Sequence, residues 1–238
     1  MRRMAILVGL FALATPALAE VKSFEVIEDV PAYAGRSFDG VGTYRRVTAR
    51  ATIALDPGDP HNVVIADLGL APRSAQGRVE AVADVVILRP ADPSRGNGTL
   101  LLEVPNRGRK LALQLFDDVP QAGANTLLAA GDAGAGFLAG RGITAVWVGW
   151  RGDIPSAPGQ LALQSPVLRS VTGPVREEFV FDHNRSPAPA TLAWDIADPA
   201  SLSVTVRQAW PDPRARPEGL SLCALDARRI GVSRRGYA

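Results

Sequence analysis

Residues 99–153 constrain the fold more than any other stretch of this chain of 238 residues. The apolar run Thr99–Val104 leads into a tight Asn-Arg-Gly turn, and a second apolar run occupies Ile143–Val148. Between them lie two helix-compatible stretches, at 110–116 and 131–140. Strand, crossover helix and strand is the order of a parallel βαβ unit. The sequence therefore predicts a parallel strand pair, with the first strand buried on both faces.

The first nineteen residues predict a secretory signal peptide. Arg2 and Arg3 supply a positive start, Ala5–Ala14 is apolar, and Ala17-Leu18-Ala19 has the small residues of a cleavage site. Cleavage would leave Glu20 as the first residue. The apolar run is shorter than the roughly 20 residues that cross a bilayer, and no later segment approaches that length. We therefore expect export to the periplasm or the extracellular space, with no membrane span.

Charge and cysteine content exclude several classes of partner and of stabilisation. Without Arg2 and Arg3 the basic and acidic residues balance at 24 each, and the charges are scattered along the chain. Nucleic-acid binding needs a basic stripe, so no nucleic-acid partner is expected. Cys223 is the single cysteine, which excludes an internal disulfide. Packing alone must stabilise the fold.

Further strands are predicted on both sides of the βαβ unit. Apolar residues alternate over Arg46–Leu55 and Arg78–Arg89, and a short apolar run covers Val63–Leu68. Beyond Asp153 the predicted strands are Leu161–Val167, Val175–Phe181 and Leu202–Val206. The segment 211–238 has six arginines and no apolar period, so it is predicted to be poorly ordered.

Several short phrases along the chain resemble one protein family. They are Gly35-Arg36-Ser37-Phe38, Gly42-Thr43-Tyr44, Leu70-Ala71-Pro72-Arg73, Leu88-Arg89-Pro90, Arg95-Gly96-Asn97-Gly98, Val104-Pro105-Asn106-Arg107-Gly108, Gly136-Phe137-Leu138 and Gly149-Trp150-Arg151-Gly152-Asp153. Together they make residues 25 to about 206 similar to the N-terminal portion of the large secreted alpha/beta hydrolase domain-containing proteins of bacteria.

The resemblance implies an α/β fold class and a domain plan. The fold would be the β-rich N-terminal part of an alpha/beta-hydrolase-like sheet with a β-rich insertion, apparently incomplete because members of the family are longer. The plan is a signal peptide at 1–19, the N-terminal portion of the hydrolase domain at 20–210, and a divergent tail at 211–238. A truncated or frameshifted reading would explain the tail, and a genuine divergent terminus is the alternative.

The resemblance also implies two site loops. In α/β hydrolases the turn after this first strand supplies one backbone N–H to the oxyanion hole, which makes Asn106, Arg107 and Gly108 the candidates. The alternative is a plain turn, since Asn and Gly tolerate unusual dihedrals. Trp150, Gly152 and Asp153 are candidates for a pocket loop, because ligands bind at the carboxyl ends of strands. Asp153 could instead simply cap the following turn.

No catalytic, metal or cofactor residue is predicted from this chain. The nucleophile elbow G-x-S-x-G does not occur in it. His61 and His183 are the only histidines, and no ligand set has metal spacing. Gly134–Ala139 satisfies G-x-G-x-x-A, but the strand that a dinucleotide site needs does not precede it. Glu177 and Glu178 are interpreted as a solvated strand edge.

The leading hypothesis is thus an exported fragment of a serine esterase-type hydrolase that lacks its nucleophile, acid and His and is inactive alone. Its full-length form would act on a small-molecule ester, without a cofactor. The alternative is a non-catalytic secreted β-rich binding or accessory module. A third reading, a hydrolase that uses Ser156 or Ser165, lacks any patterned His or acid.

Overall fold

The computed structural model describes residues 20–154, 157–179 and 189–234. The chain forms two compact units, Met1–Leu168 and Arg169–Ala238. They are called the first and the second unit. The predicted signal peptide, Ser156, His183 and the chain from 180 to 188 lie outside the described residues.

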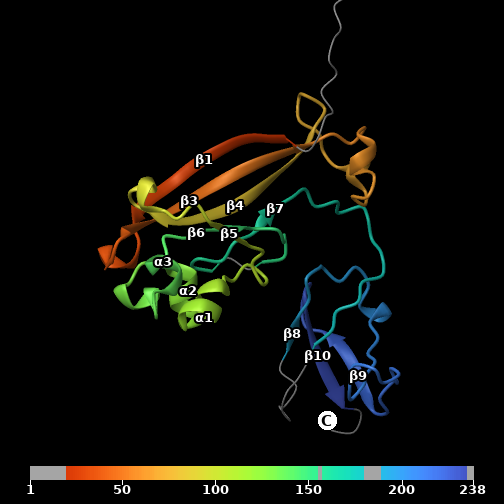
Figure 1. The fold of residues 1–238 in the computed structure, drawn as a ribbon. Coiled ribbons are helices and arrows are strands. Elements are labelled where there is room, and N and C mark those ends of the chain that lie inside the picture. The colour runs from red at the N-terminus through yellow and green to blue at the C-terminus, as the bar shows by residue number, and fades with distance from the viewer. Residues whose placement is uncertain (1–19, 155–156, 180–188, 235–238) are drawn as a thin grey trace, which may run out of the picture. The chain divides into compact units, whose positions relative to one another are not determined.

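The first unit is built on a mixed seven-stranded sheet (Figure 1). The strand order is β1-β3-β4-β6-β5, while β2 pairs with β3 and β7 pairs with β4. The strands are β1 (Glu20–Pro31), β2 (Ser37–Phe38), β3 (Gly42–Leu55), β4 (Val79–Pro90), β5 (Leu100–Glu103), β6 (Thr144–Val148) and β7 (Leu163–Gln164). The first unit is thus β-rich, with a mixed parallel and antiparallel sheet and few helices.

Long antiparallel pairing between β3 and β4 confirms the two alternating runs that the sequence predicted. Their register extends from Tyr44↔Pro90 to Leu55↔Val79. Strand β1, which the sequence analysis missed, pairs antiparallel with β3 through two register shifts. Its side chains are almost all exposed, so it has no buried face to produce a strong apolar period.

The predicted parallel pair is present as β5 and β6, whose register runs from Leu100↔Thr144 to Glu103↔Trp147. The crossover between them carries α1 (Ala112–Asp117), α2 (Gln121–Thr126) and α3 (Phe137–Gly140). Figure 1 shows the three helices together on one side of the sheet. They cover a core on that face that includes Tyr33, Tyr44, Leu88, Leu113 and Trp147.

The prediction that the first strand of this pair is buried on both faces is wrong. Leu100 and Leu102 are 61% and 60% exposed, while Leu101 packs against the core. Among the described strands β5 pairs only with β6, so it is an edge strand. The helices cover the face of Leu101, and nothing in the described part of the first unit covers the face of Leu100 and Leu102.

The predicted strand at Val63–Leu68 is also absent. The connection from β3 to β4 instead contains short 3-10 turns at Pro60–Asn62 and Leu68–Leu70. The Asp59 carboxylate accepts a hydrogen bond from the His61 amide at 2.8 Å and caps the first turn. This local capping, without a neighbouring strand to pair with, keeps an apolar run in a loop conformation.

The second unit contains a three-stranded sheet in the order β8-β10-β9. Its strands are β8 (Ala190–Thr191), β9 (Leu220–Ala224) and β10 (Arg229–Arg234). The segment 211–238, predicted to be poorly ordered, therefore contains an antiparallel strand pair as far as 234. Two strands predicted from the sequence are absent from this unit. Of the prediction at Val175–Phe181, the described residues 175–179 form no strand. Of the prediction at Leu202–Val206, only the isolated bridge Val206↔Ala215 is present. The prediction at Leu161–Val167 shrinks to β7 of the first unit.

Candidate functional site

The two predicted site loops lie together at the carboxyl ends of β5 and β6. Because these strands are parallel, the chain leaves both at the same edge of the sheet. The Trp150 indole N–H donates to the Pro105 carbonyl at 2.7 Å. The Arg107 guanidinium donates to the Asp153 carboxylate at 2.8 Å. Two segments more than forty residues apart in the sequence are thus joined by direct hydrogen bonds.

The first loop is a tight hairpin turn. The Asn106 amide donates to the Arg109 carbonyl at 2.9 Å, and the Arg109 amide donates back to Asn106 at 3.1 Å. Arg107 and Gly108 both have positive φ, at 48° and 81°, as a type I′ turn requires. Within the described part of the chain, neither the Arg107 amide nor the Gly108 amide has an acceptor. These two N–H groups are the unused donors of the turn.

Asp153 is the charged centre of the second loop. Its side chain is only 4% exposed and forms ion pairs with Arg107 and Arg151, the latter at 2.6 Å. Burial alone would raise the pKa of Asp153, but the hydrogen bonds and charge of Arg151, together with the charge of Arg107, bring it below its usual value. Asp153 is therefore an ionised clamp between the loops, which goes beyond a simple turn cap.

Glu103, at the end of β5, fixes the ends of the first loop through hydrogen bonds of its carboxylate. Its carboxylate accepts hydrogen bonds from the Leu111 amide at 2.7 Å and the Ala112 amide at 2.8 Å. It also accepts one from the Trp147 indole on β6. The carboxylate thus ties the start of α1 to both strands and closes the chain from 104 to 110 into a fixed loop.

Lys110 holds the other side of this loop. It is fully buried, and its ammonium donates to the carbonyls of Asn125 at 2.8 Å and Gly159 at 2.6 Å. Burial, together with the nearby charge of Arg46, lowers its pKa to about 8. Neither Glu103 nor Lys110 was identified from the sequence. The available signal for both residues was their position, since each is a charged residue directly beside an apolar run or a turn.

The chain from Leu161 to Leu163 crosses both loops. The Leu161 amide donates to the Gly108 carbonyl at 2.9 Å, and the Leu163 amide donates to the Arg151 carbonyl at 2.9 Å. A side chain at Gly108 would meet Ile154 and Leu161 at 2.8 Å. Gly108 is therefore needed for close packing as well as for its positive φ.

Of the two alternative nucleophiles, Ser156 and Ser165, only Ser165 falls within the described residues, and it lies beside the second loop. Its Oγ would be 3.5 Å from a Cβ placed on Gly152. Neither His nor carboxylate bonds to that Oγ in the described part of the chain. His61 lies in the β3–β4 connection instead, where its ring bonds to Asp59 at 2.8 Å. No described His bonds to a Ser, Thr or Cys side chain, and the hydroxyl–carboxylate hydrogen bonds that are present, Ser94 to Asp92 at 2.7 Å and Thr126 to Asp132 at 3.1 Å, involve no His.

Glu177 and Glu178, which the sequence analysis interpreted as a solvated strand edge, lie in the second unit. Glu178 forms ion pairs with Arg207 and Arg214, and Glu177 accepts from the Ala193 amide, so both carboxylates are more engaged than a solvated edge. Within the described ranges, no group of three or more His, Cys, Asp or Glu residues is placed to hold a metal ion. No described helix is long and apolar enough to cross a membrane.

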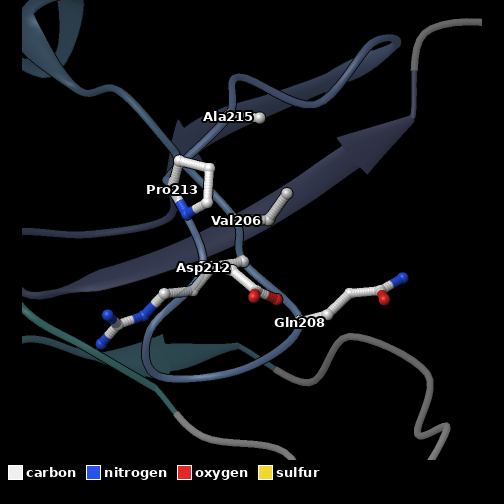
Figure 2. A pocket seen from close by; sticks show the side chains of 6 residues that line it. Val206, Gln208, Asp212, Pro213 and Ala215 are labelled. Carbon is white, nitrogen blue, oxygen red and sulfur yellow. The ribbon is translucent and has the colours of Figure 1, made fainter.

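The second unit also has a hollow of about 410 Å³, shown in Figure 2. Its lining is Val206, Arg207, Gln208, Asp212, Pro213 and Ala215. The Arg207 guanidinium is already committed to Glu178 and lies 4.0 Å from the centre of the Trp210 ring. The Asp212 carboxylate accepts from the Ala209 amide. The charged groups of this hollow therefore already serve the loop itself.

Comparison with protein-family models, with curated proteins and with solved structures found no match to this chain. The geometry of the two loops is therefore the basis for a functional assignment. It offers two free backbone donors and a buried ion-paired carboxylate at one sheet edge. Such a site can orient or stabilise an anion, but it lacks a group that attacks a substrate.

Proposed function

We propose that this chain is the N-terminal part of an exported α/β hydrolase, as its sequence resemblance suggests. In this role the Asn106–Gly108 turn supplies an oxyanion-hole donor and the Trp150–Asp153 loop lines the substrate pocket. The substrate class is a small-molecule ester or a related acyl compound. The nucleophile, acid and His would belong to a part that this sequence does not contain, so the chain alone is inactive as an esterase.

One observation carries this proposal: the Arg107 and Gly108 amides have no acceptor among the described residues, and they lie in a turn at the carboxyl end of a parallel edge strand. Such turns are where α/β sheets place ligands, and free N–H groups there can bind a developing oxyanion. Glu103, Lys110 and Asp153 hold the turn rigidly. Rigid donors stabilise charge without reorganising, which favours a catalytic use over a plain turn.

The first experiment is to read the gene through and beyond the codon for Ala238 in all three frames. A G-x-S-x-G elbow followed by an acid and a His supports the proposal. The joined polypeptide should then hydrolyse short p-nitrophenyl esters and react with a fluorophosphonate probe, whereas the present chain should do neither. Absence of an elbow in every frame would contradict the proposal.

A second candidate function is a non-catalytic secreted binding or accessory module. The contiguous core around Trp147, Tyr33 and Tyr44 favours it, because a unit with such a core can fold without further strands. A soluble chain with one cooperative unfolding transition in its first unit, and no elbow in the gene, would support this alternative. Aggregation through an exposed sheet edge would support the incomplete hydrolase.

A further inference from the structure

The second unit has an exposed tryptophan at the border of its hollow. Trp210 is 76% exposed, whereas tryptophan is highly buried on average in folded proteins. In the chain it lies between Gln208 and Asp212, which both line the hollow of about 410 Å³. Arg207 is a further lining residue, and its guanidinium lies 4.0 Å from the centre of the Trp210 ring. The hollow and the exposed indole therefore form one candidate site for a ligand.

The loop at 206–215, which carries this site, is closed by its own hydrogen bonds. The amides of Val206 and Ala215 donate to each other's carbonyls at 2.8 Å and 2.9 Å. Inside the loop the Asp212 amide donates to the Ala209 carbonyl at 3.1 Å, and the Ala209 amide donates to the Asp212 carboxylate at 2.9 Å. A ligand thus meets a site that is already formed, and its binding costs little ordering entropy.

The charges at the site balance and favour an uncharged ligand. Glu178 forms ion pairs with Arg207 and Arg214, and Asp212 adds a second carboxylate to the two guanidinium groups. A balanced set of charges attracts neither an anion nor a cation strongly. The Arg207 guanidinium also already takes the place over the Trp210 ring that a bound cation would use.

The polar groups left free at the site suit a ligand with several hydroxyl groups. Among the residues that the structure describes, the Gln208 carboxamide and the Trp210 indole N–H form no hydrogen bond, and Asp212 uses only its Oδ2. The side chains of Gln208 and Asp212 extend to the same side of the loop in Figure 2. A hydroxyl group both donates and accepts, so it can bond to an amide, a carboxylate or an indole N–H.

A saccharide combines these hydroxyl groups with a ring face of C–H groups, which packs on the electron-rich face of an indole. We propose that the loop at 206–215 binds a neutral saccharide, with a sugar ring stacked on Trp210 and its hydroxyl groups bonded to Gln208 and Asp212. The volume of the hollow lies within the range of small-molecule sites, roughly 300–1,000 Å³. This binding role goes beyond the hydrolase proposal and does not depend on it.

The test is an NMR titration of the isotope-labelled full chain with three neutral saccharides, cellotetraose, maltotetraose and mannotetraose. The chain has four tryptophans, and Trp210→Phe identifies the indole N–H signal of Trp210 by its loss. With at least one saccharide, the Trp210 indole and Gln208 carboxamide signals should shift and reach saturation. The indole signal of Trp194, which is 56% exposed in the same unit, should not move.

Matched variants test the same contacts by affinity. Trp210→Ala should weaken binding about tenfold, and Trp194→Ala should leave it unchanged. Gln208→Ala should weaken binding about fivefold, because it removes hydrogen bonds to the sugar. Unchanged signals of the remaining indoles show that each variant is folded.

Four results would overturn the proposal. The first is no shift of the Trp210 signal with any of the three saccharides, and the second is an equal loss of affinity in Trp210→Ala and Trp194→Ala. The third is a shift of the Trp210 signal with sodium phosphate, which would mean that the site binds an anion. The fourth is a shift with protein concentration alone, which would mean that a second copy covers the loop.

Discussion

Gly108 and Lys110 show how much single residues contribute to the candidate site. Gly108 combines a positive φ with a close approach of the Leu161 backbone, and Lys110 is a buried cation held by two carbonyls. The sequence pointed to Gly108 through its turn, because glycine in an Asn-x-Gly stretch has a specific backbone meaning. It did not point to Lys110, because burial of a lysine depends on segments that are distant in the chain.

Gly108→Ala should destabilise the first unit markedly. Its Cβ would lie 2.8 Å from Ile154 and from the Leu161 carbonyl oxygen, in addition to the strain of a φ of +81°. Gly40 has a similar φ of +75° with open space around it, so Gly40→Ala is the matched control. We expect about 1 kcal/mol for the control and at least about 2 kcal/mol more for Gly108→Ala, measured by urea unfolding. Equal costs would show that the packing around Gly108 is loose.

Lys110 should make stability rise with pH. Its folded pKa of about 8 lies below the unfolded value, so the unfolded chain binds more protons between these values. Between pH 8 and 10 the free energy of unfolding should rise by about 2 kcal/mol relative to Lys110→Met. The difference between wild type and variant cancels other groups, including Tyr44, whose pKa burial raises to about 12. Parallel pH profiles for both proteins would contradict a buried, weakly basic Lys110.

At the scale of elements, the predictions were correct for strands with one buried face and for the crossover helix that joins the parallel pair. β3, β4 and β6 have alternating or compact apolar runs, and α1 lies close to its predicted stretch. The strand predicted at Val63–Leu68 is absent because this apolar run forms a loop, in which Val63 and Val64 stay exposed and Leu68 is buried. β1 was missed because it is exposed and lies at a sheet edge, where pairing with β3 and not burial defines the strand. The turn at 106–109 was located correctly, but the carboxylate that fixes it was not.

Glu103→Ala should loosen the loop that follows β5. The variant leaves the Leu111 and Ala112 amides and the Trp147 indole without their acceptor. We expect a loss of about 2–3 kcal/mol and faster hydrogen exchange at residues 106–112. Glu25→Ala, at an exposed position on β1, is the control and should change stability by less than about 0.5 kcal/mol. Unchanged exchange in the loop of Glu103→Ala would show that other contacts position it.

At the scale of the whole molecule, the chain consists of two units joined by a stretch with little regular structure. Residues 165–179 contain no helix or strand, and Arg169 and Arg176 are exposed there. Beyond the predicted signal peptide at 1–19, the sequence analysis placed its boundary at 210, because it followed the extent of the family resemblance. Contacts between distant residues, which the sequence does not display, define the division at Leu168.

Limited trypsin digestion should therefore cut first after Arg169 or Arg176. The expected product is a resistant fragment that contains the whole sheet of the first unit, identified by intact mass. The double variant Arg169→Gln/Arg176→Gln should slow the first cut strongly. A first cut after Arg73, which is also exposed, would show that the β3–β4 connection opens more readily than the junction.

The two edges of the first sheet differ, and this gives the sheet a direction of growth. β1 carries Glu20, Lys22, Glu25, Glu28 and Asp29 and has two register shifts, which are the features that discourage a further strand. β5 reads Leu-Leu-Leu-Glu, and its one charge turns inward to Leu111, Ala112 and Trp147. A strand added to this sheet would therefore join at β5, directly beside the Asn106–Gly108 turn. Completing the sheet and completing the site would then be one event.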